Sequence, residues 1–156
     1  MDAILELDNC TKIRLNSAIV NSIGIAAFLA ENKKSDLWII VASYYSMFYM
    51  ADAVLFKLGY KVGDRMPHKV TANALIVFVR NKLRKRLLEE YEEAKSEALP
   101  GIKADVLIDE FDKEREKRGI LQYETTAVEK HAKAVTSLKR AKNFIFEMEK
   151  LLEDLK

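Results

Sequence analysis

Arg118 and Tyr123 are the residues of this sequence that most directly suggest a binding or catalytic site. They lie five positions apart in the stretch 117–126, KRGILQYETT, where Gly119 can end or loosen a helix. An arginine binds phosphate oxygens through two parallel hydrogen bonds, and a tyrosine supplies a hydroxyl donor and a flat face for stacking. The spacing therefore predicts that the two side chains flank one cleft that accepts a phosphate group.

The helical pattern around Arg118 predicts that its side chain points into the protein. Arg118 continues an apolar stripe formed by Leu107 and Phe111, so it faces the bundle or a partner subunit. A buried guanidinium is costly unless it is paired or lines a wet cleft. Two interpretations stay open: a phosphate site, or a structural ion pair, for example with Asp52, in which Tyr123 packs the junction between two helices.

The remaining reactive residues limit the chemistry further. His68 and His131 are the only histidines and Cys10 is the only cysteine, so one chain cannot supply a multi-histidine or cysteine-cluster metal site. No phosphate-binding loop, dinucleotide fingerprint or serine-hydrolase motif occurs. The basic run 80–86, RNKLRKR, suits phosphate contacts, but it also balances the acidic run 89–93 on the same helix. We expect no metal and no cofactor.

The composition is that of a globular domain. The 156 residues are 49% hydrophobic and 32% charged, with a formal net charge of +2, so bulk charge does not indicate nucleic acid or an anionic membrane. The first ten residues lack the basic segment of a secretory signal. The uncharged stretch 37–51 is shorter than the roughly 20 residues of a membrane span. We expect one cytoplasmic domain over residues 1–156, with no membrane segment and with 37–51 as a buried helix.

Helical periodicity runs along the chain without β-alternation of useful length, which predicts an all-α, up-down bundle of about five helices. The second helix carries apolar residues at alternating steps of four and three and is aromatic on its other face, which places it at the centre of the bundle or in an interface. The five expected helices cover roughly 4–32, 36–59, 67–98, a segment from about 103, and 126 to the C-terminus.

Local signals mark the ends of these helices. Ser35 or Asp36 caps the second helix, and Gly59 follows its last turn. The dipeptide Pro-Gly at 100–101 predicts a break after the third helix. The stretch 126–129, TAVE, has the pattern of a capping box and predicts the start of the last helix.

Several segments, in order along the chain, resemble one known family. The stretch 42–51, ASYYSMFYMA, is similar to the second helix of HEPN domains (higher eukaryotes and prokaryotes nucleotide-binding). The segments 55–59, LFKLG, and 67–70, PHKV, follow in the same order. Arg118 and Tyr123, followed by a long amphipathic helix, resemble the site of that family. The subgroup that the chain most resembles is the small, stand-alone, mostly prokaryotic proteins often encoded beside a minimal nucleotidyltransferase.

This resemblance implies a helical bundle, usually a homodimer, with a cleft at or near the dimer interface. Many members are metal-independent ribonucleases or toxins whose signature is an arginine, four to six residues and a histidine. Arg118 matches the arginine, whereas Tyr123 stands where the histidine is expected. Free tyrosine titrates near about 10 and histidine near about 6.5, so Tyr123 is the weaker general base. His68 would replace the missing histidine if the fold brings it close; otherwise it caps or packs locally.

Three hypotheses of function follow. The first is a homodimeric binding protein that holds a nucleotide or RNA phosphate with Arg118, Tyr123 and Tyr45, within a toxin–antitoxin-like pair with a nucleotidyltransferase. The second is a metal-independent endoribonuclease that uses Arg118 with Tyr123 or His68 as acid and base. The third is a non-catalytic helical interaction module. In some related pairs the nucleotidyltransferase adenylylates a tyrosine near the motif, and Tyr123 is the nearest candidate in this chain.

Overall fold

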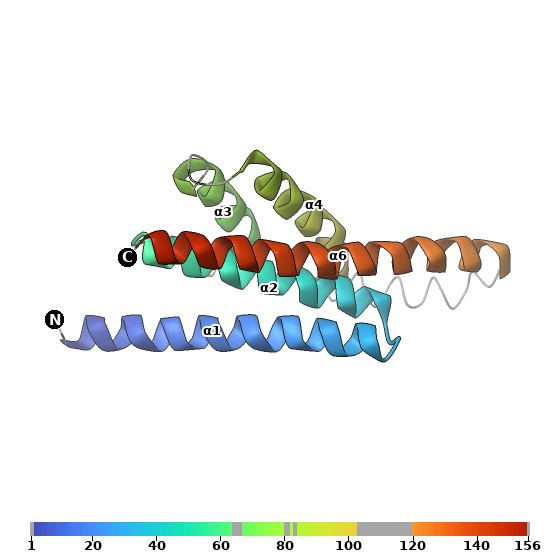
Figure 1. Ribbon diagram of the computed structural model, residues 1–156, viewed down its shortest axis with the longest axis horizontal. Coiled ribbons are helices and arrows are strands. Elements are labelled where there is room, and N and C mark those ends of the chain that lie inside the picture. The colour runs from blue at the N-terminus through green and yellow to red at the C-terminus, as the bar shows by residue number, and fades with distance from the viewer. Residues whose placement is uncertain (1, 64–66, 80–81, 83, 103–119, 156) are drawn as a thin grey trace.

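A computed structural model describes residues 2–63, 67–79, 82, 84–102 and 120–155 of the chain. Within these ranges all the regular structure is helical, which confirms the expected all-α bundle. Figure 1 shows α1, α2 and α6 running side by side along the long axis, with α3 and α4 beyond α2 and α6. The elements are α1 (Asp2–Glu31), α2 (Asp36–Lys57), α3 (Pro67–Ala74), the π-helical turn η1 (Leu75–Val79), α4 (Lys85–Ile102) and α6 (Ile120–Asp154).

The second helix is the centre of the bundle, as its sequence predicts. α2 contacts α1, α3, α4 and α6, and more than half of its residues are buried. A helix without a polar face is stable in water only when neighbours cover it on most sides. The expected apolar positions of this helix are buried at its centre and half-buried at its two ends: Leu37, Val41, Tyr44, Phe48, Ala51, Leu55 and Leu58.

Both predicted ends of α2 are confirmed by their hydrogen bonds. The hydroxyl oxygen of Ser35 accepts from the backbone N–H of Trp38 at 3.4 Å. At the other end Gly59 has φ +92°, and the backbone N–H of Tyr60 donates to the carbonyl of Leu55 at 2.9 Å. This is a Schellman termination, in which a residue with positive φ turns the chain away and satisfies the last carbonyls.

The expected helix over 67–98 is not continuous, and this prediction is wrong. The chain forms α3, widens into the π-turn η1, and starts again as α4 at Lys85. η1 has the sequence LIVFV, in which β-branched and aromatic side chains crowd a regular helix. The change of direction lets α4 pack against both α2 and α6. The basic run 80–86 therefore spans a junction, of which residues 80, 81 and 83 lie outside the described residues.

Two predicted helix ends are also wrong. α4 continues through the Pro-Gly dipeptide at 100–101 to Ile102. A proline in the last turn of a helix removes only one or two hydrogen bonds, which the preceding turns can tolerate. α6 already includes Ile120, so Thr126 lies inside the helix and the pattern TAVE is not its start. The helix expected from about residue 103 lies outside the described residues.

Two described stretches, Cys10–Glu31 and Asp36–Lys57, are long and apolar enough to cross a membrane by length and composition alone. The core position of α2 accounts for the second, because most of it is buried. In contrast, only 11% of the first stretch is buried. The apolar residues of α2 are therefore mostly buried inside the bundle, whereas many of the apolar residues of α1 are exposed.

Candidate functional site

The predicted pair of Arg118 and Tyr123 is only partly within the described residues. Arg118 lies outside them, and Tyr123 belongs to α6, but its side chain is outside the described part. A cleft between these two side chains, and the ion pair of Arg118 with Asp52, therefore stay predictions. Asp52 itself accepts a hydrogen bond from the hydroxyl of Thr71, with 2.7 Å between the two oxygens.

His68 packs against the aromatic side of α2. It is the second residue of α3, and its Nδ1 shares a hydrogen bond of 2.8 Å with the hydroxyl of Tyr44. Its ring lies 4.6 Å from the ring of Phe48 and 5.8 Å from that of Tyr45, centroid to centroid. His68 is therefore held by tertiary contacts, and Tyr45, which also stacks on Tyr49 at 5.7 Å, forms part of the same cluster.

Burial controls the protonation of this cluster. Desolvation, with a smaller effect from the charge of Lys95, lowers the pKa of His68, so the neutral imidazole predominates at pH 7. Desolvation also raises the pKa values of Tyr44 and Tyr45 and keeps both phenols neutral. Nε2 of His68 has no hydrogen-bond partner among the described residues. The cluster therefore presents one neutral histidine whose second nitrogen is open to a further partner.

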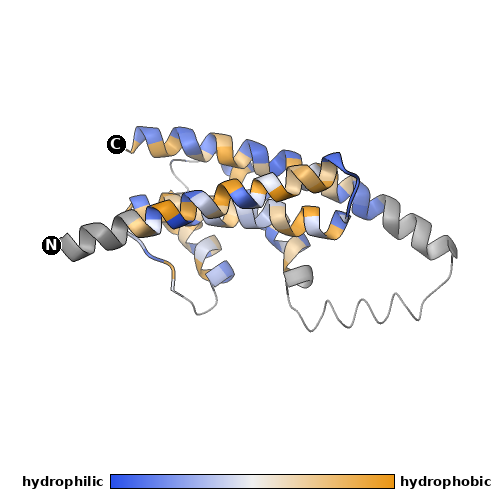
Figure 2. Ribbon diagram, turned by 90° about the horizontal axis from the view of Figure 1, so that it is seen from below, coloured by the Kyte–Doolittle hydropathy of each residue, from blue (hydrophilic) through white to orange (hydrophobic). Residues whose placement is uncertain are grey.

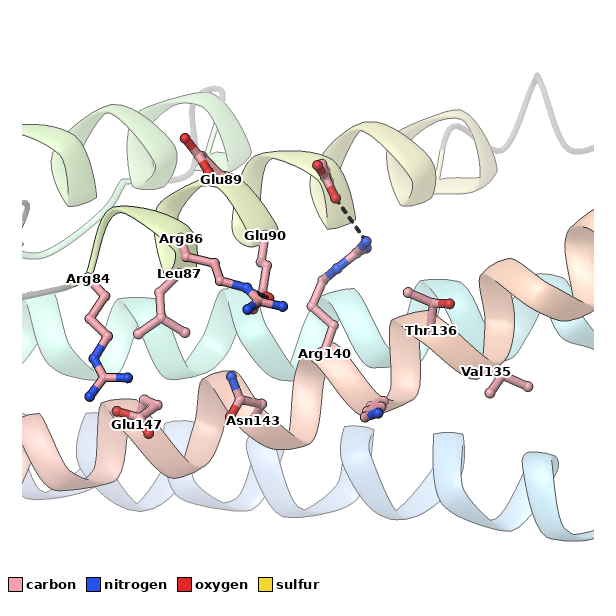
Figure 3. Close-up of a pocket in the computed structure, with 12 residues that line it drawn as sticks. Arg84, Arg86, Leu87, Glu89, Glu90, Val135, Thr136, Arg140, Asn143 and Glu147 are labelled. Atoms are coloured by element: carbon pink, nitrogen blue, oxygen red, sulfur yellow. Dashed lines mark hydrogen bonds and ion pairs between the residues drawn. The ribbon is translucent and has the colours of Figure 1, made fainter.

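A separate site lies between α4 and α6. It is a groove with a volume of about 890 Å³, and side chains from both helices project into it (Figure 3). Ligand pockets in proteins commonly have volumes of about 300–1,000 Å³. The groove is lined by Arg84, Arg86, Leu87, Glu89, Glu90, Glu93, Val135, Thr136, Lys139, Arg140, Asn143 and Glu147.

Ion pairs fix two of the arginines in this groove. Nε of Arg86 lies 3.1 Å from a carboxylate oxygen of Glu90, one helical turn away. Arg140 bridges the two helices, because its guanidinium lies 3.0 Å from Glu93 and 3.4 Å from Glu97. The side chain of Arg140 is only 9% exposed, so its position is set by these carboxylates. These contacts support the view that part of the basic run balances the neighbouring acidic residues.

Arg84 and Lys139 are the cations of the groove that remain available. Both are exposed, and the side chain of neither forms an ion pair or hydrogen bond with another described residue. Arg84 precedes α4 and is labelled in Figure 3, and Lys139 belongs to α6, so both elements contribute a cation to the lining of the groove. Asn143, on the α6 wall, adds an amide that can donate and accept. All three line the same groove, where each can contact an anionic ligand.

The groove and the His68 cluster lie on different flanks of α4. Lys95, whose charge acts on His68, is two positions from both Glu93 and Glu97, which hold Arg140. Two positions on an α-helix correspond to a rotation of about 200°. The structure therefore does not bring His68 and Tyr45 together with the basic groove.

Sequence reasoning identified the α4 wall of the groove but missed the α6 wall. Arg84 and Arg86 belong to the basic run that the sequence drew attention to, whereas Lys139 and Arg140 were passed over. A signal for Arg140 was present: polar residues recur at steps of three and four along α6, beside its apolar stripe. These residues are Thr136, Arg140, Asn143 and Glu147.

Comparison of the chain with protein-family models, with curated proteins and with solved structures finds no match.

Proposed function

We propose that the protein is a small cytoplasmic, HEPN-like helical module that binds a nucleotide through its phosphates in the groove between α4 and α6. The observation that carries the proposal is the pair Arg84 and Lys139, two cations that face one groove without a carboxylate partner among the described residues. Removing unpaired cations at a concave site from water costs free energy. Attraction to an anion that takes the place of the water offsets part of this cost.

The charge balance of the groove favours a single nucleotide over a long RNA strand. Its lining contains four basic side chains and four carboxylates, so it has no excess positive charge. A polyphosphate backbone that follows the whole groove would meet Glu89 and Glu147, and like charges repel. A nucleotide places its phosphates at one end only. Its ribose hydroxyls and base amino groups can then donate to the carboxylates.

The resemblance to HEPN domains supports two further parts of the proposal. It suggests a phosphate site of Arg118, Tyr123 and Tyr45 apart from the groove, since Tyr45 belongs to the His68 cluster, and it suggests a nucleotidyltransferase as the protein partner. Such a pair, in which one protein makes or transfers nucleotides and the other binds them, would act as a toxin–antitoxin-like system. Intact-mass measurement after co-expression with a nucleotidyltransferase tests whether an adenylyl group is added at Tyr123.

The direct test is titration of labelled ATP and of a short single-stranded RNA against the wild type, Arg84→Ala and Lys139→Ala. We expect each variant to lose about tenfold or more in nucleotide affinity, since a hydrogen bond to a charged group contributes about 1.5–3 kcal/mol. Lys69→Ala is the matched control, because Lys69 is exposed on α3 away from the groove. Unchanged nucleotide binding in Arg84→Ala and Lys139→Ala would overturn the proposal. Tighter binding of RNA than of ATP would identify RNA as the ligand of the groove.

The His68 cluster supports a second candidate function, a metal-independent endoribonuclease. In the tautomer in which Nδ1–H donates to the Tyr44 hydroxyl, the neutral imidazole of His68 has an unprotonated Nε2 that can take a proton from a ribose 2′-hydroxyl. RNA incubated with the protein in chelator should then give cyclic-phosphate ends. Because His68 also packs against Tyr44, His68→Gln is preferred to alanine. Intact RNA, or cleavage unchanged in His68→Gln, Arg118→Ala and Tyr123→Phe, would reject this function.

A further inference from the structure

The outward face of α1 is apolar and has no neighbour among the described residues. Ile19 and Ala26 lie on the inner face and are buried, and α2 is the main contact of this helix. On the opposite side Ile13, Val20 and Phe28 are 67%, 66% and 63% exposed. Figure 2 shows hydrophobic residues recurring along α1. Exposed apolar side chains in a row on one helix mark an interaction surface.

This face has the spacing of a coiled-coil seam. Ile13, Ser17, Val20 and Gly24 follow one another at steps of four, three and four, and all four are exposed. Such steps average 3.5 residues, the period that keeps one stripe of a helix facing a partner helix. We call the residues that share this face the α1 seam: Ile13, Arg14, Ser17, Val20, Gly24, Phe28 and Glu31.

Large and small residues alternate along the α1 seam in a way that matches an antiparallel copy of itself. Gly24 is a gap in the seam, because a Cβ built there would have no atom within 4 Å. In an antiparallel pair centred on residue 22, Val20 of each copy lies opposite Gly24 of the other. Phe28 then lies opposite residue 16 of the other copy, one position from the small Ser17. Val20 and Phe28 therefore each meet a small side chain, which is how knobs enter holes, and Ile13 lies opposite Glu31 at the end of the seam.

The charges at the ends of the α1 seam match the same arrangement. Arg14 and Glu31 form no ion pair with described residues. In the antiparallel pair, Arg14 of one copy lies opposite Glu31 of the other, again to within one residue. A parallel pair would instead place Arg14 beside Arg14 and Glu31 beside Glu31, which is unfavourable.

We propose that the α1 seam binds the α1 seam of a second copy of this chain, in antiparallel orientation about a two-fold axis near residue 22. The stretch Cys10–Glu31 spans about 33 Å, or about three heptads. α1 lies at the edge of the bundle, on the other side of α2 from α3 and α4 (Figure 1). The dimer therefore leaves both α4–α6 grooves open, and this inference does not depend on what those grooves bind.

Light scattering after size-exclusion chromatography measures the assembly directly. We expect the wild type to have twice the 17.9 kDa mass of the chain. Val20→Glu should give the monomer mass with unchanged helical circular dichroism, because it places a charge at the centre of the seam. Gly24→Gln provides a second route: it fills the gap while improving helix propensity, so the fold is retained and the dimer weakens. Val77→Glu is the matched control, since Val77 is 69% exposed on η1 and should leave the dimer intact.

Chemical cross-linking tests the orientation. With Cys10→Ser as background, Asn21→Cys should cross-link through a short bismaleimide, because residue 21 lies next to the two-fold axis. The native Cys10 should not cross-link, since antiparallel pairing separates its two copies by about 36 Å. Cross-linking through Cys10 alone would overturn the antiparallel arrangement. A monomeric wild type, or a dimer that survives both Val20→Glu and Gly24→Gln, would overturn the proposal. So would a monomer that floats with phosphatidylcholine vesicles, which would assign the α1 seam to lipid.

Discussion

At the scale of single residues, Asp52 is the most strongly perturbed carboxyl among those described. Desolvation raises its pKa from 3.8 to about 6, although the hydrogen bond from Thr71 acts in the opposite direction. Because the folded pKa lies above the unfolded one, the protonated form favours folding. Its contribution to stability is complete below about pH 4 and is lost as the pH rises through about 6.

The direction of this pH dependence predicts the effect of replacing Asp52. Asp52→Asn keeps an acceptor for Thr71 and removes the buried charge, so the free energy of unfolding at pH 7 should rise by an amount on the order of 2 kcal/mol. The increase in the free energy of unfolding should disappear near pH 4. Thr71→Val, which removes the donor, should lower stability at pH 7. Urea unfolding at pH 4, 5, 6 and 7 measures both effects, and an equal gain of Asp52→Asn at every pH would contradict the assignment.

His68 has the opposite pH dependence. Its pKa is lowered in the folded state, so its contribution to stability is present above the unfolded value of 6.5 and is lost as the pH falls. We expect the His68→Gln variant to lose less of its free energy of unfolding than the wild type as the pH falls below 6.5. Titration of the His68 ring protons by NMR gives the folded pKa, and a value above 6.5 would contradict the effect of burial.

The partners of these two residues could not be predicted from the sequence. Tyr44 precedes His68 by 24 positions and Asp52 precedes Thr71 by 19, so neither pair shares a helix. The pattern around His68 allowed capping, local packing or catalysis. Only the docking of α3 on α2 distinguishes these interpretations, and it places the ring of His68 against the aromatic face of α2.

At the scale of elements, the end of α2 gives a sharp prediction. Gly59 has φ +92°, a conformation that costs any residue with a Cβ. Gly59→Ala should lower the free energy of unfolding by about 1 kcal/mol. Gly63→Ala is the matched control, because Gly63 has no positive φ and no atom lies within 4 Å of an added Cβ. Equal melting temperatures for the two variants would contradict the strained termination.

The helices whose ends carry complete local signals were predicted well, and the others were not. The limits of α1 and α2 lie within about two residues of the prediction, because polar residues, a capping serine and a glycine mark them. The sequence contained no comparable signal for η1, where an apolar run stays helical but changes its hydrogen-bond period. At 100–101 and 126–129 a local stop or start signal was present, but the helices continue through both.

At the scale of the molecule, the bundle was predictable but the groove was not. Hydrophobic periodicity predicts which face of each helix is inside, and it identified α2 as the central helix. It does not predict which helices are neighbours. The groove exists because α4 and α6 pack together, and its central contact joins Arg140 to Glu93 and Glu97, more than 40 positions away. Its open cations, Arg84 and Lys139, are therefore a product of tertiary structure.

Calorimetric titration of ATP into the wild type and the double variant Arg84→Ala/Lys139→Ala shows whether the groove binds a nucleotide. The groove between α4 and α6 predicts one site per chain in the wild type. The double variant, folded by circular dichroism, should bind about 100-fold more weakly, because two charge-assisted contacts are lost. Equal affinities for the two proteins, or no binding of ATP by the wild type, would contradict the assignment of this groove as a nucleotide site.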